Sequence, residues 1–159
     1  MIIKLEVNDK FYEINIEPGE SLLDVLRERL GLTGARRGCS GGGCGTCTVL
    51  LDNKPVYSCG VFAAQAEGKK VTTVEGLARN GNLHLLQKAF IEYGAVQCGY
   101  CTPGQIMAAK ALLDKNAEPT EKEVKEAIAG NLCRCTGYVK IIKAIQGAGE
   151  MIREGGSNG

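Results

Sequence analysis

Residues 38–47 read GCSGGGCGTC, with five glycines and three cysteines in ten positions. Glycine loses more backbone entropy on ordering than any other residue, so such a loop needs a strong interaction to hold it. Together with the next cysteine along the chain, the spacing is C-x4-C-x2-C-x11-C, formed by Cys39, Cys44, Cys47 and Cys59. Plant-type [2Fe–2S] sites have the spacing C-x4-C-x2-C…C. The stretch therefore predicts a [2Fe–2S] cluster on these four thiolates.

The glycines fit the same interpretation. A [2Fe–2S] cluster with four thiolates is anionic, and inward-pointing backbone N–H groups stabilise its charge. Glycine lets the backbone approach closely and adopt positive φ. A zinc site usually spaces its ligands as C-x2–4-C…C-x2-C and does not call for five glycines. Zinc and free or disulfide-bonded cysteines are therefore the weaker alternatives for this group.

A second group of four cysteines has the spacing C-x2-C-x31-C-x-C and comprises Cys98, Cys101, Cys133 and Cys135. The CGYC pair lacks the surrounding βαβ pattern of a thioredoxin-like motif. It is not a haem attachment site, because Thr102 follows it, and a Rieske centre needs two histidines whereas the chain has only His84. The spacing alone indicates a metal site and leaves iron–sulfur and zinc both open.

The composition is that of an ordinary globular protein, with 44% hydrophobic and 23% charged residues among 159. The net charge is +1, and basic and acidic residues are well mixed along the chain, so the sequence offers no basic region that would bind nucleic acid or a membrane surface. No apolar run approaches the roughly 20 residues of a membrane span. The start, MIIKLEVNDK, lacks a secretory pattern, so we expect a cytoplasmic location. In a reducing compartment, eight cysteines favour metal binding or redox chemistry over disulfides.

The secondary-structure signals change between the two cysteine groups. Residues 1–76 alternate with period 2 around the polar turns at Asn8-Asp9 and Asp52-Asn53. The predicted elements are strands at 2–7, 11–16, 47–52, 54–59 and 69–75, and a helix at about 22–30 capped by Ser21. Such strands with one packed helix predict a small α+β domain.

Residues 77–159 show apolar spacing near 3.6 and no strand signal. The predicted helices are 83–94, 104–116, 120–130 and 137–152. Thr120 and Glu123 form a capping box, and His84 is expected on a helix surface. Four short helices predict a bundle-like second domain.

Three stretches together resemble the iron–sulfur subunit of the xanthine dehydrogenase / aldehyde oxidoreductase family of molybdenum hydroxylases. They are GCSGGGCGTCTVLLDNKPVYSC at 38–59, GAVQCGYCTPGQIM at 94–107 and GNLCRCTGY at 130–138. The resemblance covers nearly the whole chain. It implies a plant-ferredoxin-like (β-grasp) domain followed by a four-helix bundle, each with one [2Fe–2S] cluster, and so favours iron–sulfur over zinc in the second group as well.

The resemblance also implies partners. In the family a large subunit carries molybdenum on a pterin cofactor and a medium subunit carries FAD, so we expect a hetero-oligomer. The chain itself is implied to be an electron relay between the two, without catalytic residues. Its second cluster would lie nearest the pterin, which Gln97 and Cys135 would contact, and the first cluster would face the flavin.

Several alternatives stay open within and outside this family. A reductive member such as 4-hydroxybenzoyl-CoA reductase is the runner-up within it, and the substrate is not indicated. Two hypotheses come from other functional classes. One is a free-standing two-cluster electron carrier of the ferredoxin type, and the other is an interaction module stabilised by zinc. The family often has GEGEC where this chain has SGGGC at 40–44, a difference that leaves ligation untouched. For Arg36 and Arg37 two interpretations stay open: cations that partly offset the cluster charge or meet a partner, and residues of an exposed loop. Tyr100 and Tyr138 are expected to serve packing rather than electron relay.

Overall fold

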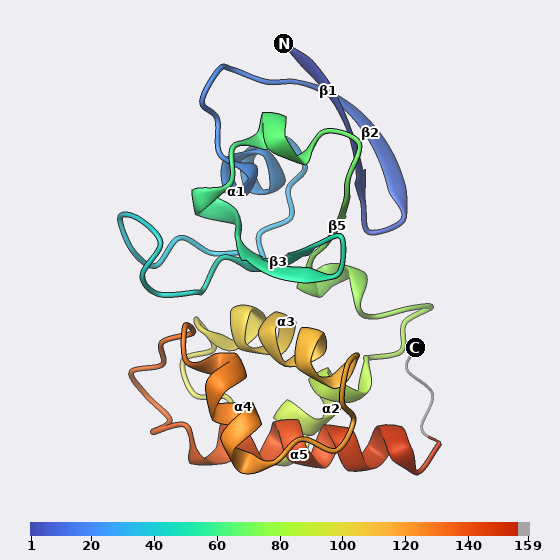
Figure 1. Cartoon of the computed structure of the whole chain (residues 1–159), viewed down its shortest axis with the longest axis vertical. Coiled ribbons are helices and arrows are strands. Elements are labelled where there is room, and N and C mark those ends of the chain that lie inside the picture. Colours follow the sequence, from blue (N-terminus) through green and yellow to red (C-terminus); the bar gives the residue numbers. More distant parts are fainter. Residues whose placement is uncertain (156–159) are drawn as a thin grey trace.

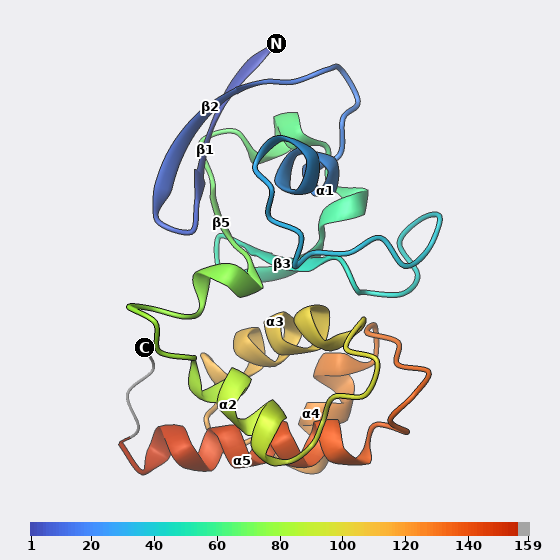
Figure 2. The same cartoon turned by 180° about the vertical axis from the view of Figure 1, so that it is seen from behind.

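The computed structural model describes residues 1–155 and has two layers, one formed by each half of the chain (Figure 1). The N-terminal half holds a five-stranded sheet and the short helix α1, Leu22–Asp24. The C-terminal half holds the helices α2 (Leu85–Glu92), α3 (Thr102–Leu113), α4 (Glu121–Ile128) and α5 (Val139–Arg153). Helix α3 lies beneath strand β3 in both views (Figures 1 and 2). The chain is therefore of the α+β class.

The sheet has the strand order β2-β1-β5-β3-β4. Its strands are β1 (Ile2–Val7), β2 (Lys10–Asn15), β3 (Thr48–Leu51), β4 (Lys54–Tyr57) and β5 (Lys70–Thr72). Strands β1 and β5 pair in parallel, and the other pairs are antiparallel. Both predicted hairpins form around their polar turns, where Asn8, Asp9, Asp52 and Asn53 all have positive φ, as tight hairpin turns require.

Two sequence predictions in this half are wrong in part. The helix predicted at 22–30 is α-helical only over Leu22–Asp24 and continues as a π-helical turn over Val25–Arg29. Apolar spacing over so short a segment does not distinguish the two hydrogen-bond patterns, although Ser21 caps the helix as predicted. The strand predicted at 69–75 ends at Thr72, because the Thr73 N–H donates to the Asn8 side chain at 2.9 Å and a 3-10 turn follows.

Two hydrophobic cores meet at β3. Val49, fully buried, packs among the sheet residues and α1, whereas its neighbour Leu50 packs in the core of the four C-terminal helices. Successive side chains of a strand point to opposite faces, so β3 is covered on both. This sandwiching of β3 brings its N-terminal end, and the glycine-rich loop before it, against the start of α3.

In the helical half, the Thr120–Glu123 capping box is confirmed, with the Glu123 N–H donating to Thr120 Oγ1 at 3.2 Å. The prediction for His84 is wrong: its side chain is buried rather than on a helix surface. His84 is the N-cap of α2, and its Nδ1 accepts from the Leu86 N–H at 3.1 Å, which turns the ring inward. Within residues 1–155, no helix is long and apolar enough to cross a membrane.

Candidate metal centres

The first cysteine group, called tetrad A, surrounds the N-terminal end of β3. Cys39 and Cys44 lie on the glycine-rich loop, Cys47 directly precedes β3, and Cys59 lies in the 3-10 turn that follows β4. Antiparallel pairing of β3 with β4 places Thr48 opposite Tyr57, which brings Cys47 and Cys59 together. Their Sγ atoms are 3.4 Å apart. Cys44 and Cys47 are buried, whereas Cys39 and Cys59 are half-buried.

The loop directs backbone donors at Cys39. The Gly43 N–H lies 3.4 Å from the Cys39 Sγ. Hydrogen bonds from the N–H groups of Gly43, Gly41 and Cys44 lower the pKa of Cys39 to about 7. Burial instead raises the pKa of Cys47 to about 11. One side of the tetrad thus stabilises an anion by itself, and the other side needs a bound cation to stabilise its thiolate.

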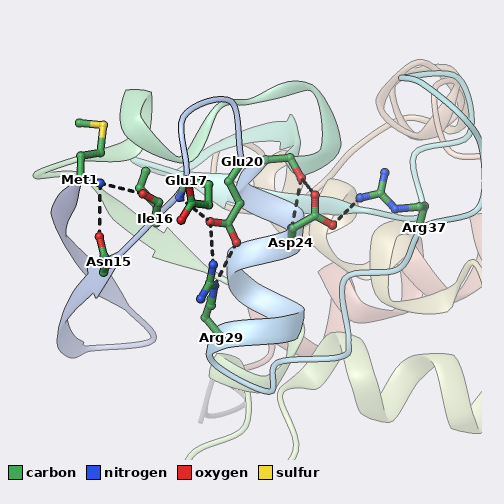
Figure 3. A network of polar contacts seen from close by, with 9 residues as sticks. Met1, Asn15, Ile16, Glu17, Glu20, Asp24, Arg29 and Arg37 are labelled. Carbon is green, nitrogen blue, oxygen red and sulfur yellow. Dashed lines mark hydrogen bonds and ion pairs between the residues drawn. The ribbon is translucent and has the colours of Figure 1, made fainter.

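An ionic contact ties this loop to helix α1 (Figure 3). The Arg37 guanidinium donates to Asp24 Oδ1 at 2.5 Å, and Ser21 Oγ donates to the other carboxylate oxygen at 2.6 Å. The Ser21 hydrogen bond, together with Arg37, holds the pKa of Asp24 below its usual value. Arg37 lies in an exposed loop, in line with one of the two interpretations, and is nevertheless paired with Asp24.

The second group, called tetrad B, gathers between helix ends. Cys98 follows α2, Cys101 is the N-cap of α3, and Cys133 and Cys135 lie between α4 and α5. The Sγ atoms of Cys98 and Cys135 are 3.5 Å apart, and both residues are exposed. Cys101 is buried, and this burial raises the pKa of its thiol to about 12, with the neighbouring Cys133 adding to the effect.

Cys133 receives the donors on this side. The Thr136 N–H lies 3.4 Å from its Sγ, and the Thr136 hydroxyl lies 3.1 Å from it. Burial opposes ionisation of Cys133, but the bonds from Thr136, together with those from the Cys135 N–H and the Cys101 thiol, outweigh it and lower the pKa. Each tetrad therefore combines a hydrogen-bonded thiol with a buried one that resists ionisation.

Tetrad B encloses space. A hollow of about 550 Å³ is lined by its four thiols and also by Cys44 of tetrad A. Arg134 and Tyr138 line the same hollow. The hollow thus extends from tetrad B as far as Cys44 of tetrad A.

The thiols approach one another two by two. Cys47 lies beside Cys59 and Cys98 beside Cys135, while Cys39 contacts Cys44 and Cys101 contacts Cys133. Within the described residues, no three His, Cys, Asp or Glu side chains gather as they would around a single ion. Two thiolates on each of two irons is the donor set of a [2Fe–2S] cluster. The arrangement fits this group and differs from the four convergent donors of a zinc site.

Backbone and side-chain contacts connect the tetrads. The Leu132 N–H donates to the Cys44 carbonyl at 2.8 Å. On the outer side, Arg36 Nη1 donates to the Gly99 carbonyl at 2.6 Å, and its guanidinium lies 5.3 Å from the Tyr100 ring centroid. The Tyr100 hydroxyl donates to the Arg37 carbonyl at 2.7 Å. Sequence reasoning missed these roles, since no local pattern signals contacts between residues more than 60 positions apart.

Gln97 directly precedes Cys98, and both side chains are exposed, as is that of Cys135. These three residues form the outer edge of tetrad B, open to a partner. The structure thus leaves the two residues expected to contact a pterin accessible.

Two family models match the chain. The 2Fe-2S iron-sulfur cluster binding domain matches residues 5–78, and the [2Fe-2S] binding domain matches residues 73–146. The chain therefore contains two [2Fe–2S]-binding domains in succession.

Individual proteins match over nearly the full chain. The nicotinate dehydrogenase small FeS subunit of Eubacterium barkeri is 53% identical over 93% of this chain and 94% of its own length. A crystal structure of quinoline 2-oxidoreductase from Pseudomonas putida 86 superposes with a TM-score of 0.93 at 45% identity, covering 99% of this chain and 98% of that chain. The aldehyde oxidoreductase of Desulfovibrio gigas gives the same TM-score at 40% identity; it covers 99% of this chain, which corresponds to only 18% of that longer one.

Proposed function

Because the chain belongs to the iron–sulfur subunits of the xanthine dehydrogenase / aldehyde oxidoreductase family of molybdenum hydroxylases, we propose that its two tetrads carry electrons between two partner subunits. One partner would hold a molybdenum–pterin cofactor and the other FAD. Each bound [2Fe–2S] cluster supplies a carrier for one electron. The chain itself contributes ligands, hydrogen-bond donors and a fixed framework, and it carries no catalytic residue of its own.

One observation carries this proposal: the two sets of four cysteines, far apart in sequence, are joined by the hydrogen bond from Leu132 to Cys44. An electron relay needs its two clusters close together, whereas a binding module that uses metal ions only for stability does not need its metal sites to be neighbours. We assign Cys39, Cys44, Cys47 and Cys59 to the first cluster. We assign Cys98, Cys101, Cys133 and Cys135 to the second.

The chain's own groups fit the charges that these clusters bring. Four thiolates give each site a negative charge, which the backbone N–H groups around Cys39 and the Thr136 donors beside Cys133 stabilise. The buried thiols of Cys47 and Cys101 would lose their protons only when iron binds, so loading releases protons.

The finer architecture belongs to the same proposal. We assign residues 1–76 to a plant-ferredoxin-like β-grasp domain and residues 77–159, of which 156–159 lie outside the described residues, to a four-helix-bundle domain. The two hydrophobic clusters support this division, because one contains only residues of the first half and the other is formed by the helices, with Leu50 of β3 packed into it. The exposed edge formed by Gln97, Cys98 and Cys135 would meet the pterin-bearing subunit, and tetrad A would face the flavin-bearing one.

The relatives support a partnered chain. One is named as the small subunit of a dehydrogenase, and the aldehyde oxidoreductase match occupies a fraction of a much longer chain. The decisive experiment is purification of the tagged chain from its native host under mild conditions. We expect it to co-purify with a larger chain that contains molybdenum and with an FAD-containing chain. Recovery of the chain alone with all its iron would instead indicate a free-standing carrier.

A further inference from the structure

Asn131 is a buried amide at the junction of the two tetrads, with 4% of its surface exposed. Its Nδ2 donates to the Gly45 carbonyl at 2.9 Å and to Thr48 Oγ1 at 3.0 Å. These acceptors belong to the segment that carries Cys44 and Cys47. The Asn131 side chain, from the helical half, thus forms hydrogen bonds with tetrad A on both sides of Cys47.

The backbone of Asn131 is held from the helical half. Its carbonyl accepts from Gln105 Nε2 at 2.7 Å. Gln105 is fully buried on α3, four residues after Cys101, and its Oε1 has no hydrogen-bond partner within residues 1–155. The bond to the Asn131 carbonyl is therefore the only hydrogen bond that the Gln105 side chain makes among the described residues. The chain then runs through Leu132, which bonds the Cys44 carbonyl, directly to Cys133.

Backbone contacts leave little freedom at this junction. A Cβ added to Gly45 would lie 2.3 Å from the Gly130 carbonyl, and one added to Gly104 would lie 2.3 Å from the Gly45 carbonyl. Beyond Asn131, by contrast, Leu132, Arg134 and Cys135 are exposed. The segment bearing Cys133 and Cys135 is thus held at its buried end by Asn131 and, toward α5, by the Tyr138 hydroxyl, which accepts from the Cys133 N–H at 2.8 Å.

We propose that Asn131 is a positioning residue that fixes the separation and orientation of tetrad A relative to tetrad B, and hence of the clusters that they bind. The inference rests on the proposed function, since it concerns the spacing of two carriers. Asn131 is not among the ligands assigned to either cluster. It acts through the carbonyl of Gly45 and the hydroxyl of Thr48. Because both N–H groups of its buried amide must reach these two acceptors, the two loops can be joined in only one relative position.

The test replaces Asn131 by Leu, which has a similar volume and no donor, in the full chain loaded with clusters. Asn116→Leu is the matched control, because Asn116 also makes two side-chain hydrogen bonds but lies in the turn between α3 and α4. Dithionite reduces both clusters, and low-temperature EPR then measures the magnetic splitting and the relaxation enhancement that each cluster imposes on the other. Both effects depend on the distance and orientation between the clusters.

We expect the native chain and Asn116→Leu to show the same splitting and Asn131→Leu to lose it, with iron and sulfide contents unchanged. Retention of the native splitting in Asn131→Leu would overturn the inference while leaving the two-cluster proposal intact. Failure of the native chain to bind two clusters would overturn the proposed function itself. If Asn131→Leu does not fold, Asn131→Ala decides, since it removes both donors without adding bulk and leaves the bond from Thr48 Oγ1 to the Gly45 carbonyl in place: a loss of splitting supports the inference, and an unchanged splitting contradicts it.

Discussion

The Leu132 N–H donates to the carbonyl oxygen of Cys44 at 2.8 Å, so a ligand of one proposed cluster is hydrogen-bonded to the residue preceding Cys133, a ligand of the other. The two halves of the chain therefore do not merely touch: their cysteine loops share a backbone hydrogen bond. Stability of this junction and integrity of the two clusters should therefore depend on each other.

Gly45→Ala should destabilise the chain by roughly 2–4 kcal/mol, combining the cost of a positive φ with that of a steric clash. Gly45 has a φ of 72°, and its added Cβ would lie 2.3 Å from the Gly130 carbonyl. Gly43→Ala is the matched control, because an added Cβ there meets nothing within 4 Å and the N–H to Cys39 is kept. Thermal unfolding of both variants measures the difference. Equal melting temperatures would show that the junction tolerates a side chain.

Tyr57→Phe removes the hydroxyl that donates to the Gly130 carbonyl at 2.9 Å. We expect a loss of about 1 kcal/mol in unfolding free energy, the usual net contribution of one hydrogen bond. Chemical denaturation of the cluster-loaded chain measures it. Tyr12→Phe serves as a control, since this half-buried tyrosine lies on β2, away from the junction. A larger loss in the control than in Tyr57→Phe would count against a special role for the junction.

His84 should make the chain sensitive to mild acid. Burial, reinforced by the charge of Lys110, lowers the pKa of His84 from 6.5 to about 4. Between these values the unfolded chain binds the proton and the folded chain does not, so the free energy of unfolding falls as the pH drops from 6.5 to 4. Above this window the contribution is constant.

His84→Asn keeps an acceptor for the Leu86 N–H and removes the titration. The melting temperature of this variant should fall less than that of the native chain between pH 6.5 and pH 4. Parallel pH profiles for the two proteins would show that His84 does not titrate in this way.

Single cysteine substitutions should remove one cluster at a time. Cys59→Ala is expected to lower the iron content from about four atoms per chain to about two, and Cys101→Ala to do the same by removing the other cluster. Each variant should keep one of the two EPR signals, and the signals kept should differ. Loss of the same signal from both variants would contradict the assignment of the ligands to two separate sites.

The local features of the sequence predicted much of this structure. The spacing around GCSGGGCGTC indicated tetrad A, and the polar turns at Asn8-Asp9 and Asp52-Asn53 indicated both hairpins, because each depends on neighbouring residues alone. The Thr120–Glu123 capping box was predictable for the same reason. The second cysteine group required a family resemblance, since its spacing alone left zinc and iron–sulfur both open.

What the sequence did not predict depends on distant contacts. Gly45 looks like one more glycine of a flexible loop, yet it is the residue against which Gly130 and Gly104 pack. Arg36 reads as a surface cation, but it reaches Gly99 across 63 positions of sequence. His84 reads as a surface residue because its capping role and its burial against the helical half emerge only in the folded chain.

Quantitative iron, sulfide and zinc analysis of the purified chain, combined with EPR after reduction, shows whether the chain binds two [2Fe–2S] clusters. We expect about four irons and four labile sulfides per chain, no stoichiometric zinc, and two distinct [2Fe–2S] signals. A colourless chain containing zinc, or one with about two irons and a single signal, would contradict this expectation.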